Sequence, residues 1–137
     1  MGRAVFFRGG VNWPYADGMP VWITTVVLLA ASNVFMTYAW YYHLKVKTWH
    51  IAVAIVASWG IAFFEYCLQV PANRMAHVSN GGAFSAPQLE IIQEGLTLAV
   101  FAVFSTFVLG ERLRWTDYVA FGLIMAGVVV GMLGKQD

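Results

Sequence analysis

The sequence has little cysteine and little charge, and each scarcity excludes a class of protein. Cys67 is the single cysteine among 137 residues, so neither an intrachain disulfide framework nor a cysteine-based metal cage is expected. Charged residues make up 11% of the chain, whereas ordinary soluble domains carry about 25%. The formal net charge of +1 provides no basic surface for nucleic acid. These shortages argue against an ordinary soluble domain and against a nucleic-acid-binding protein.

Motifs that carry catalysis are also missing from the chain. No Ser/His/Asp order, no metal-ligand spacing and no phosphate-binding loop can be identified. Cys67, beside Tyr66, is interpreted as a packing residue rather than a nucleophile. We therefore expect no enzyme activity, no cofactor and no metal site.

Long apolar runs are what the sequence does contain. Hydrophobic residues make up 60% of the chain, and four runs approach or reach the roughly 17–25 residues that cross a bilayer. The sequence predicts an all-α integral membrane protein with four transmembrane helices and short loops, in one domain over 19–137. The expected helices cover about 21–42, 51–70, 88–109 and 118–133, with Pro71 ending the second. Residues 1–18 predict an irregular arm, either an interfacial tail or a docking segment for a larger membrane complex.

Polar residues recur at helical spacing inside these runs. Asn33 and Thr37 share one face of the first helix, where they either form interhelical hydrogen bonds or line a pathway. In the second helix, small residues spaced four apart lead to Glu65 and Gln69. The third helix carries one polar face made of Glu90, Gln93, Glu94 and Thr97, and Ser85 with Gln88 predicts a capping box before it.

The acidic residues are the main candidates for a functional site. We expect the second and third helices to be antiparallel neighbours, which places Glu65 and Glu94 at similar depth near the loop that joins them. An ionised carboxylate in hydrocarbon costs at least about 2.5 kcal/mol, so two nearby carboxylates would share a proton or bind a cation. Tyr66, Gln69 and Gln93 would complete that site. The alternative is a structural network in which Glu90 forms an ion pair with Arg74.

The fourth helix and the loop charges bear on assembly. Gly122 with Ala126, and Gly127 with Gly131, form two pairs of small residues that favour either packing within one subunit or a dimer seam. The lysines and arginines divide four against four between the two sides of the membrane. An even division is typical of a dual-topology protein that forms antiparallel dimers, although chance also produces it.

Several stretches resemble, in order, an uncharacterised bacterial family of four-helix membrane proteins, a domain of unknown function. They are SNVFMT (32–37), AWY (39–41), HLK (43–45), SWGIAFFEY (58–66), VPANR (70–74), FS (84–85), QL (88–89) and IQE (92–94). That family is grouped with the drug/metabolite transporter superfamily, whose repeat also ends in segments similar to GERL (110–113) and GLIMAG (122–127). The small multidrug exporters of the superfamily use a glutamate in their first helix, where this chain has only Asn33.

The resemblance implies a multi-pass protein of the bacterial inner membrane that transports a small molecule as a homodimer. Any proton coupling would depend on Glu65 or Glu94, because the first helix has no carboxylate. A different class of function stays open, namely a non-transporting accessory subunit of a larger membrane complex.

Overall fold

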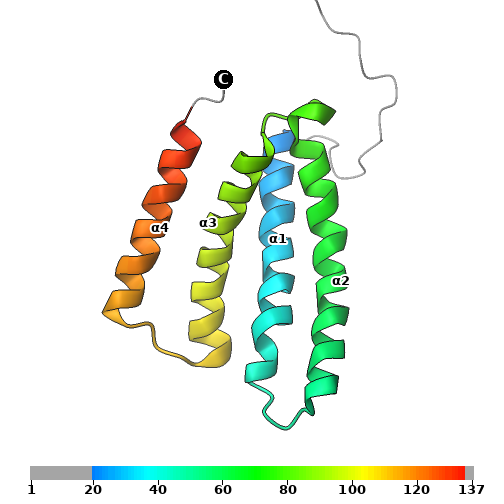
Figure 1. Ribbon diagram of the computed structural model, residues 1–137, viewed down its shortest axis with the longest axis vertical. Coiled ribbons are helices and arrows are strands. Elements are labelled where there is room, and N and C mark those ends of the chain that lie inside the picture. Colours follow the sequence, from blue (N-terminus) through cyan, green and yellow to red (C-terminus); the bar gives the residue numbers. More distant parts are fainter. Residues whose placement is uncertain (1–19, 135–137) are drawn as a thin grey trace, which may run out of the picture.

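The computed structural model describes residues 20–134, which form four helices joined by short connections (Figure 1). These are α1 (Val21–Tyr41), α2 (Ile51–Ala76), α3 (Ala86–Phe104) and α4 (Trp115–Leu133). Short helical turns follow the first three, namely η1 (Tyr42–Leu44), η2 (Val78–Asn80) and the π-helical η3 (Ser105–Leu109). All four helices are long and apolar enough to cross a membrane, which confirms the predicted fold class.

The order of the helices in space differs from their order in the chain. Figure 1 shows α1 between α2 and α3, with α4 at the outer side of α3. The main contacts agree with this view, because α1 packs against α2 and α3 while α4 packs against α3. The expectation that α2 and α3 are direct neighbours along their length is therefore wrong. They approach each other only near the loop that joins them, where Gln69 contacts Gln93.

Small and polar residues allow α1 to take this central position. Its buried residues are Thr24, Thr25, Leu29, Ser32, Asn33, Thr37 and Ala39. Thr25 Oγ1 donates to the Val21 carbonyl at 2.7 Å, and Ser32 Oγ donates to the Leu29 carbonyl at 3.0 Å. These bonds within the helix satisfy the hydroxyl groups, and the small side chains let neighbouring backbones approach closely.

Pro71 does not end α2, contrary to the sequence prediction. The helix continues for more than a turn to Ala76, and His77 N donates to the Asn73 carbonyl at 3.1 Å. A proline removes one backbone donor, but it leaves the following residues free to continue the ladder. Ala72, Met75 and Ala76 are buried, so packing holds this last turn in place.

The start of α3 confirms the predicted capping box. Ser85 Oγ accepts from the Gln88 backbone N–H, and the Gln88 side chain accepts from the Ser85 backbone N–H. Pro87 lies in the first turn, where its missing N–H has no intrahelical partner to lose. The connection before it is tied to α2, since Asn80 Nδ2 donates to the Arg74 carbonyl at 2.9 Å.

Helix α4 packs against α3, and its glycines differ in how closely other residues approach them. A Cβ at Gly131 would lie 2.7 Å from Ile91 Cδ1 of α3, so this glycine allows close helix contact. A Cβ at Gly122 or Gly127 would meet nothing within 4 Å. Gly131 therefore serves packing within the subunit, whereas Gly122 and Gly127 have open space around them among the described residues.

Candidate functional site

Asn33 lies at the centre of the bundle and joins α1 to α3. Its side chain is 0% exposed. Its Nδ2 donates to the Leu29 carbonyl at 2.8 Å, and its Oδ1 accepts from Thr97 Oγ1 at 2.6 Å. Thr37 Oγ1 in turn donates to the Asn33 carbonyl at 2.7 Å. Asn33 thus forms the interhelical hydrogen bond that was one of its two predicted roles.

Glu65 is also buried, but it lies apart from the other acidic residues. Its side chain is 7% exposed on a helix that packs against α1. Within residues 20–134 its carboxylate makes no hydrogen bond or ion pair. Tyr66 is 59% exposed, because consecutive residues of a helix point about 100° apart. The structure therefore brings Tyr66 to the outer surface rather than into a site with Glu65.

A cavity of about 500 Å³ lies between α1, α3 and α4, and we call it the inner cavity. Four predicted site residues, Thr37, Glu90, Gln93 and Glu94, line it together with Thr97. Glu90 and Glu94 are one helical turn apart, and both are exposed in the single chain. The other lining residues are mostly large and apolar, namely Met36, Trp40, Tyr41, Leu98, Phe101 and Phe121.

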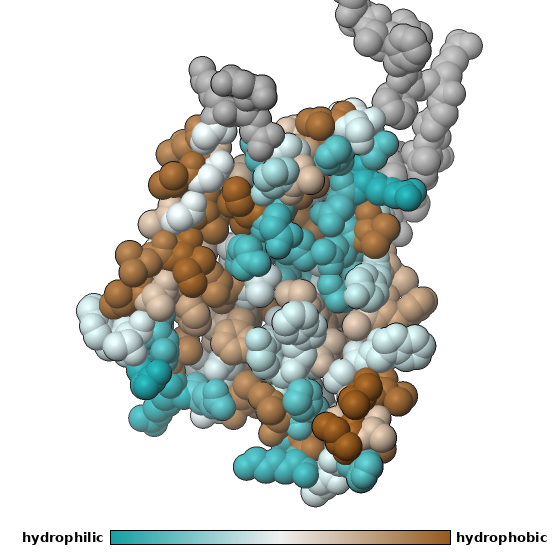
Figure 2. Space-filling model, viewed as in Figure 1, coloured by the Kyte–Doolittle hydropathy of each residue, from teal (hydrophilic) through white to brown (hydrophobic). Residues whose placement is uncertain are grey.

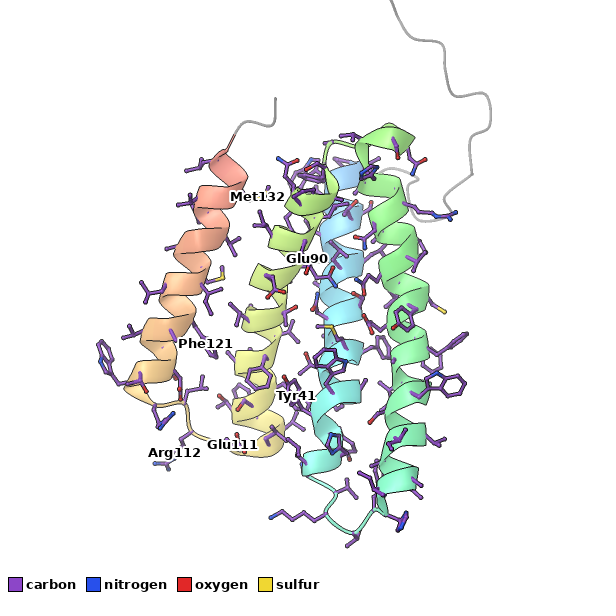
Figure 3. The ribbon with its side chains drawn as sticks, in the orientation of Figure 1. Tyr41, Glu90, Glu111, Arg112, Phe121 and Met132 are labelled. Atoms are coloured by element: carbon purple, nitrogen blue, oxygen red, sulfur yellow. The ribbon has the colours of Figure 1, made fainter. Side chains whose placement is uncertain are left out.

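Aromatic side chains form the wall of the inner cavity farther from the α2–α3 loop. The ring centroids of Tyr41 and Phe101 lie 4.8 Å apart, which joins α1 to α3. Figure 3 shows Glu90 nearer the α2–α3 loop than Tyr41 on α1 and Phe121 on α4. The cavity therefore has an acidic end and an aromatic end, an arrangement that suits a small cation with an apolar part.

A second cavity, of about 400 Å³, lies where α2 and α3 meet, and we call it the loop-end cavity. Gln69 Nε2 donates to Gln93 Oε1 at 3.1 Å across it. Glu90 and Gln93 line both cavities, so the two spaces adjoin. The remaining lining residues of the loop-end cavity are Asn73, Arg74, His77, Asn80, Ala86 and Leu89.

Two predicted pairings of charged groups are not formed. Arg74 and Glu90 line the same cavity, yet the only ion pair within residues 20–134 joins Arg114 to Asp117, at 3.5 Å. Glu65 and Glu94 do not share a cavity either. The reason is the position of α1, against which α2 packs, so Glu65 does not reach the cavity that Glu94 lines. The carboxylates that do lie together are Glu90 and Glu94.

Hydrophilic residues gather on one face at the loop end of the bundle. Figure 2 shows them over the ends of α2 and α3, bordered by apolar surface over α4. Asn73 and His77 line the loop-end cavity but were not predicted as site residues. Asn73 follows Gln69 by four residues and His77 follows Asn73 by four, so both continue the polar stripe of α2 past Pro71. The sequence prediction ended this helix at residue 70, so it did not follow the polar stripe as far as Asn73 and His77.

No group of three His, Cys, Asp or Glu side chains in residues 20–134 is arranged to hold a metal ion. The candidate site is instead a pair of adjoining cavities, each lined in part by polar side chains, in an apolar bundle.

The sequence model of one protein family matches residues 25–132, and that family is described as "Putative member of DMT superfamily (DUF486)". The match covers all four helices apart from a few residues at either end. No curated protein and no solved structure matches the chain.

Proposed function

The chain belongs to the DUF486 family, grouped with the drug/metabolite transporter superfamily, and on that premise we propose that it is a small-molecule transporter of the bacterial inner membrane. The observation that carries the proposal is the inner cavity between α1, α3 and α4, which Glu90 and Glu94 line on helices apolar enough to cross a membrane. Acidic side chains at membrane depth are costly and mark ion or substrate pathways. A purely structural bundle would not need such a cavity.

The cavity favours a cationic substrate, with proton exchange at the same carboxylates. Two acidic side chains one turn apart attract a positive charge, and the aromatic end supplied by Trp40, Tyr41 and Phe121 offers apolar and cation–π contacts. Glu94 is the preferred coupling residue because it lies one turn deeper than Glu90. Glu65 remains a candidate for a proton site of its own on the α2 side, since it is buried without a charged partner among residues 20–134.

A homodimer would complete the site. Glu90 and Glu94 are exposed in the single chain, and lipid tails cannot solvate their charge. A second copy would cover the open side of the inner cavity, and α4 offers it small residues with open space around them at Gly122 and Gly127. Alternating access would then come from rocking one subunit against the other.

The test measures proton movement in liposomes that contain the purified protein and a trapped pH dye. Candidate cationic metabolites are added outside, and wild type is compared with Glu94→Gln, Glu90→Gln and Glu65→Gln. Glu111→Gln is the matched control, because Glu111 lies in the α3–α4 loop and lines neither cavity.

We expect substrate-driven proton flux that Glu94→Gln abolishes, that Glu90→Gln reduces and that Glu111→Gln leaves unchanged. Equal flux in all variants would overturn the assignment of the cavity. No flux with any metabolite, from a protein that is purified only with a stable partner, would instead favour the accessory-subunit function.

A further inference from the structure

The loop-end cavity combines opposite charges that do not neutralise each other. Arg74 comes from the last turns of α2 and Glu90 from the first turns of α3. Both side chains are exposed and line the same space, and no ion pair joins them. A guanidinium and a carboxylate in this position each have hydrogen-bonding capacity left for another molecule.

Asn73 adds an unpaired acceptor to the cavity. Its Oδ1 is buried and has no hydrogen-bond partner within residues 20–134. Buried polar atoms are nearly always paired, so an unpaired carbonyl oxygen beside a cavity is a reason to expect a donor there. Neighbouring groups are already engaged, since Asn80 Nδ2 donates to the Arg74 carbonyl and Gln69 Nε2 to Gln93.

From these groups we propose that the loop-end cavity binds a small zwitterion, a molecule with both an ammonium and an anionic group. Arg74 holds the anionic group, Glu90 holds the ammonium, and Asn73 Oδ1 accepts one ammonium hydrogen. Ala86 and Leu89 give the cavity a small apolar side. Its volume of about 400 Å³ is within the roughly 300–1,000 Å³ of small-molecule sites.

The position of the cavity gives this site a role in the proposed transport. Glu90 and Gln93 line both cavities, so a zwitterion at the loop end lies next to the inner cavity. This role rests on the proposed function and adds a substrate class to it, namely small zwitterions. Binding at the loop end can nevertheless be measured without any transport.

Zwitterionic chemistry has two sources at a membrane surface, a free solute and the headgroup of phosphatidylethanolamine. The experiment uses the full chain in nanodiscs of phosphatidylglycerol, with and without phosphatidylethanolamine. Isothermal titration calorimetry compares L-leucine with L-leucinamide, which lacks the anion, and with N-acetyl-L-leucine, which lacks the ammonium.

The variants are Arg74→Gln and Glu90→Gln, with Arg112→Gln and Glu111→Gln as matched controls. The control residues carry the same charges in the α3–α4 loop at the other end of the bundle (Figure 3). Because all four side chains are exposed, the substitutions leave the core intact, and size-exclusion chromatography in nanodiscs checks folding.

We expect L-leucine to bind and both single-charge analogues to bind the loop-end cavity about tenfold more weakly or worse, as for the loss of one charge-assisted hydrogen bond. L-leucinamide bound in the inner cavity is recognised because Arg74→Gln does not weaken it, since Arg74 lines only the loop-end cavity. Arg74→Gln and Glu90→Gln should each weaken L-leucine binding by a similar factor, while the controls keep wild-type affinity. If phosphatidylethanolamine weakens L-leucine binding in wild type but not in the two variants, the lipid headgroup occupies the site. If it has no effect, the ligand is a free solute.

Equal binding of all three probes, no binding of L-leucine in either lipid, or unchanged affinity in Arg74→Gln and Glu90→Gln would overturn the zwitterion site. A failed proton-flux experiment alone would leave these equilibrium results standing, so the two proposals fail separately.

Discussion

Helices α1 and α4 are both apolar enough to cross a membrane, yet they differ completely in burial. Five of the seven buried residues of α1 carry polar side chains, among them Asn33 and Thr37. Helix α4 has no buried residue, and Leu123 and Val130 are each 70% exposed. In a membrane, lipid solvates apolar side chains as well as a protein interior does, so small size and polar side chains decide which helix is central.

The largest effect is expected from removing the polar centre of α1, which tests whether buried polar side chains hold this helix in its central position. Asn33→Ala leaves Thr97 Oγ1 without its acceptor and opens a void between α1 and α3. We expect a loss of about 2–3 kcal/mol in the free energy of unfolding. Reversible unfolding in mixed micelles measures it, with Thr97→Val as the second arm of a double-mutant cycle. Additive losses in the double variant would contradict a direct bond.

The next largest effect concerns the one packed side of α4. Gly131→Leu forces a side chain against Ile91, which a Cβ alone would already approach to 2.7 Å. We expect a loss of about 1–2 kcal/mol in the free energy of unfolding, at the lower end for overpacking because the outer side of α4 is free to move. The same unfolding assay measures it. Wild-type stability would show that α4 does not pack through Gly131.

A smaller and different effect is expected on the open side of α4. A Cβ at Gly127 would meet nothing within 4 Å in the single chain, so we expect Gly127→Leu to leave the free energy of unfolding of the monomer unchanged. If this face forms the homodimer, the substitution should weaken dimerisation about tenfold, or about 1.4 kcal/mol. Energy transfer between labelled subunits in liposomes measures the dimer, and an unchanged dimer would exclude this face as the seam.

The smallest effect is expected at a side chain that lipid surrounds. Leu123→Ala should change the free energy of unfolding by less than about 0.5 kcal/mol, because lipid fills the space that the side chain leaves. The unfolding assay used for Asn33→Ala provides the comparison. A loss above 1 kcal/mol would mean that Leu123 packs against protein and that α4 is buried in the assembly.

Local chemistry made parts of this structure predictable. The lengths of the apolar runs predicted the four helices, and the spacing of Ser85 and Gln88 predicted the cap of α3. Both features were predictable because they depend on residues close in the chain. The interhelical bond of Asn33 was one of two predicted roles. The arrangement of the helices in space was not predictable, because it depends on which apolar faces match. That arrangement separates Glu65 from Glu94 and brings Glu90 and Glu94 into one cavity with Phe121.

The predicted dimer and the predicted substrate chemistry remain proposals, as does the exchange of protons. The predicted arm over residues 1–18 lies outside the described residues.

Pro71 has a mechanical consequence for α2. The proline has no N–H, so the carbonyl of Cys67 receives no hydrogen bond from the position where the helical ladder would supply one. The resistance of the helix to bending is therefore reduced at this point. Glu65 lies on one side of this weak point, while Asn73 and Arg74 lie on the other. The helix is thus divided into a long and a short segment, and the short one carries Asn73 and Arg74 of the loop-end cavity.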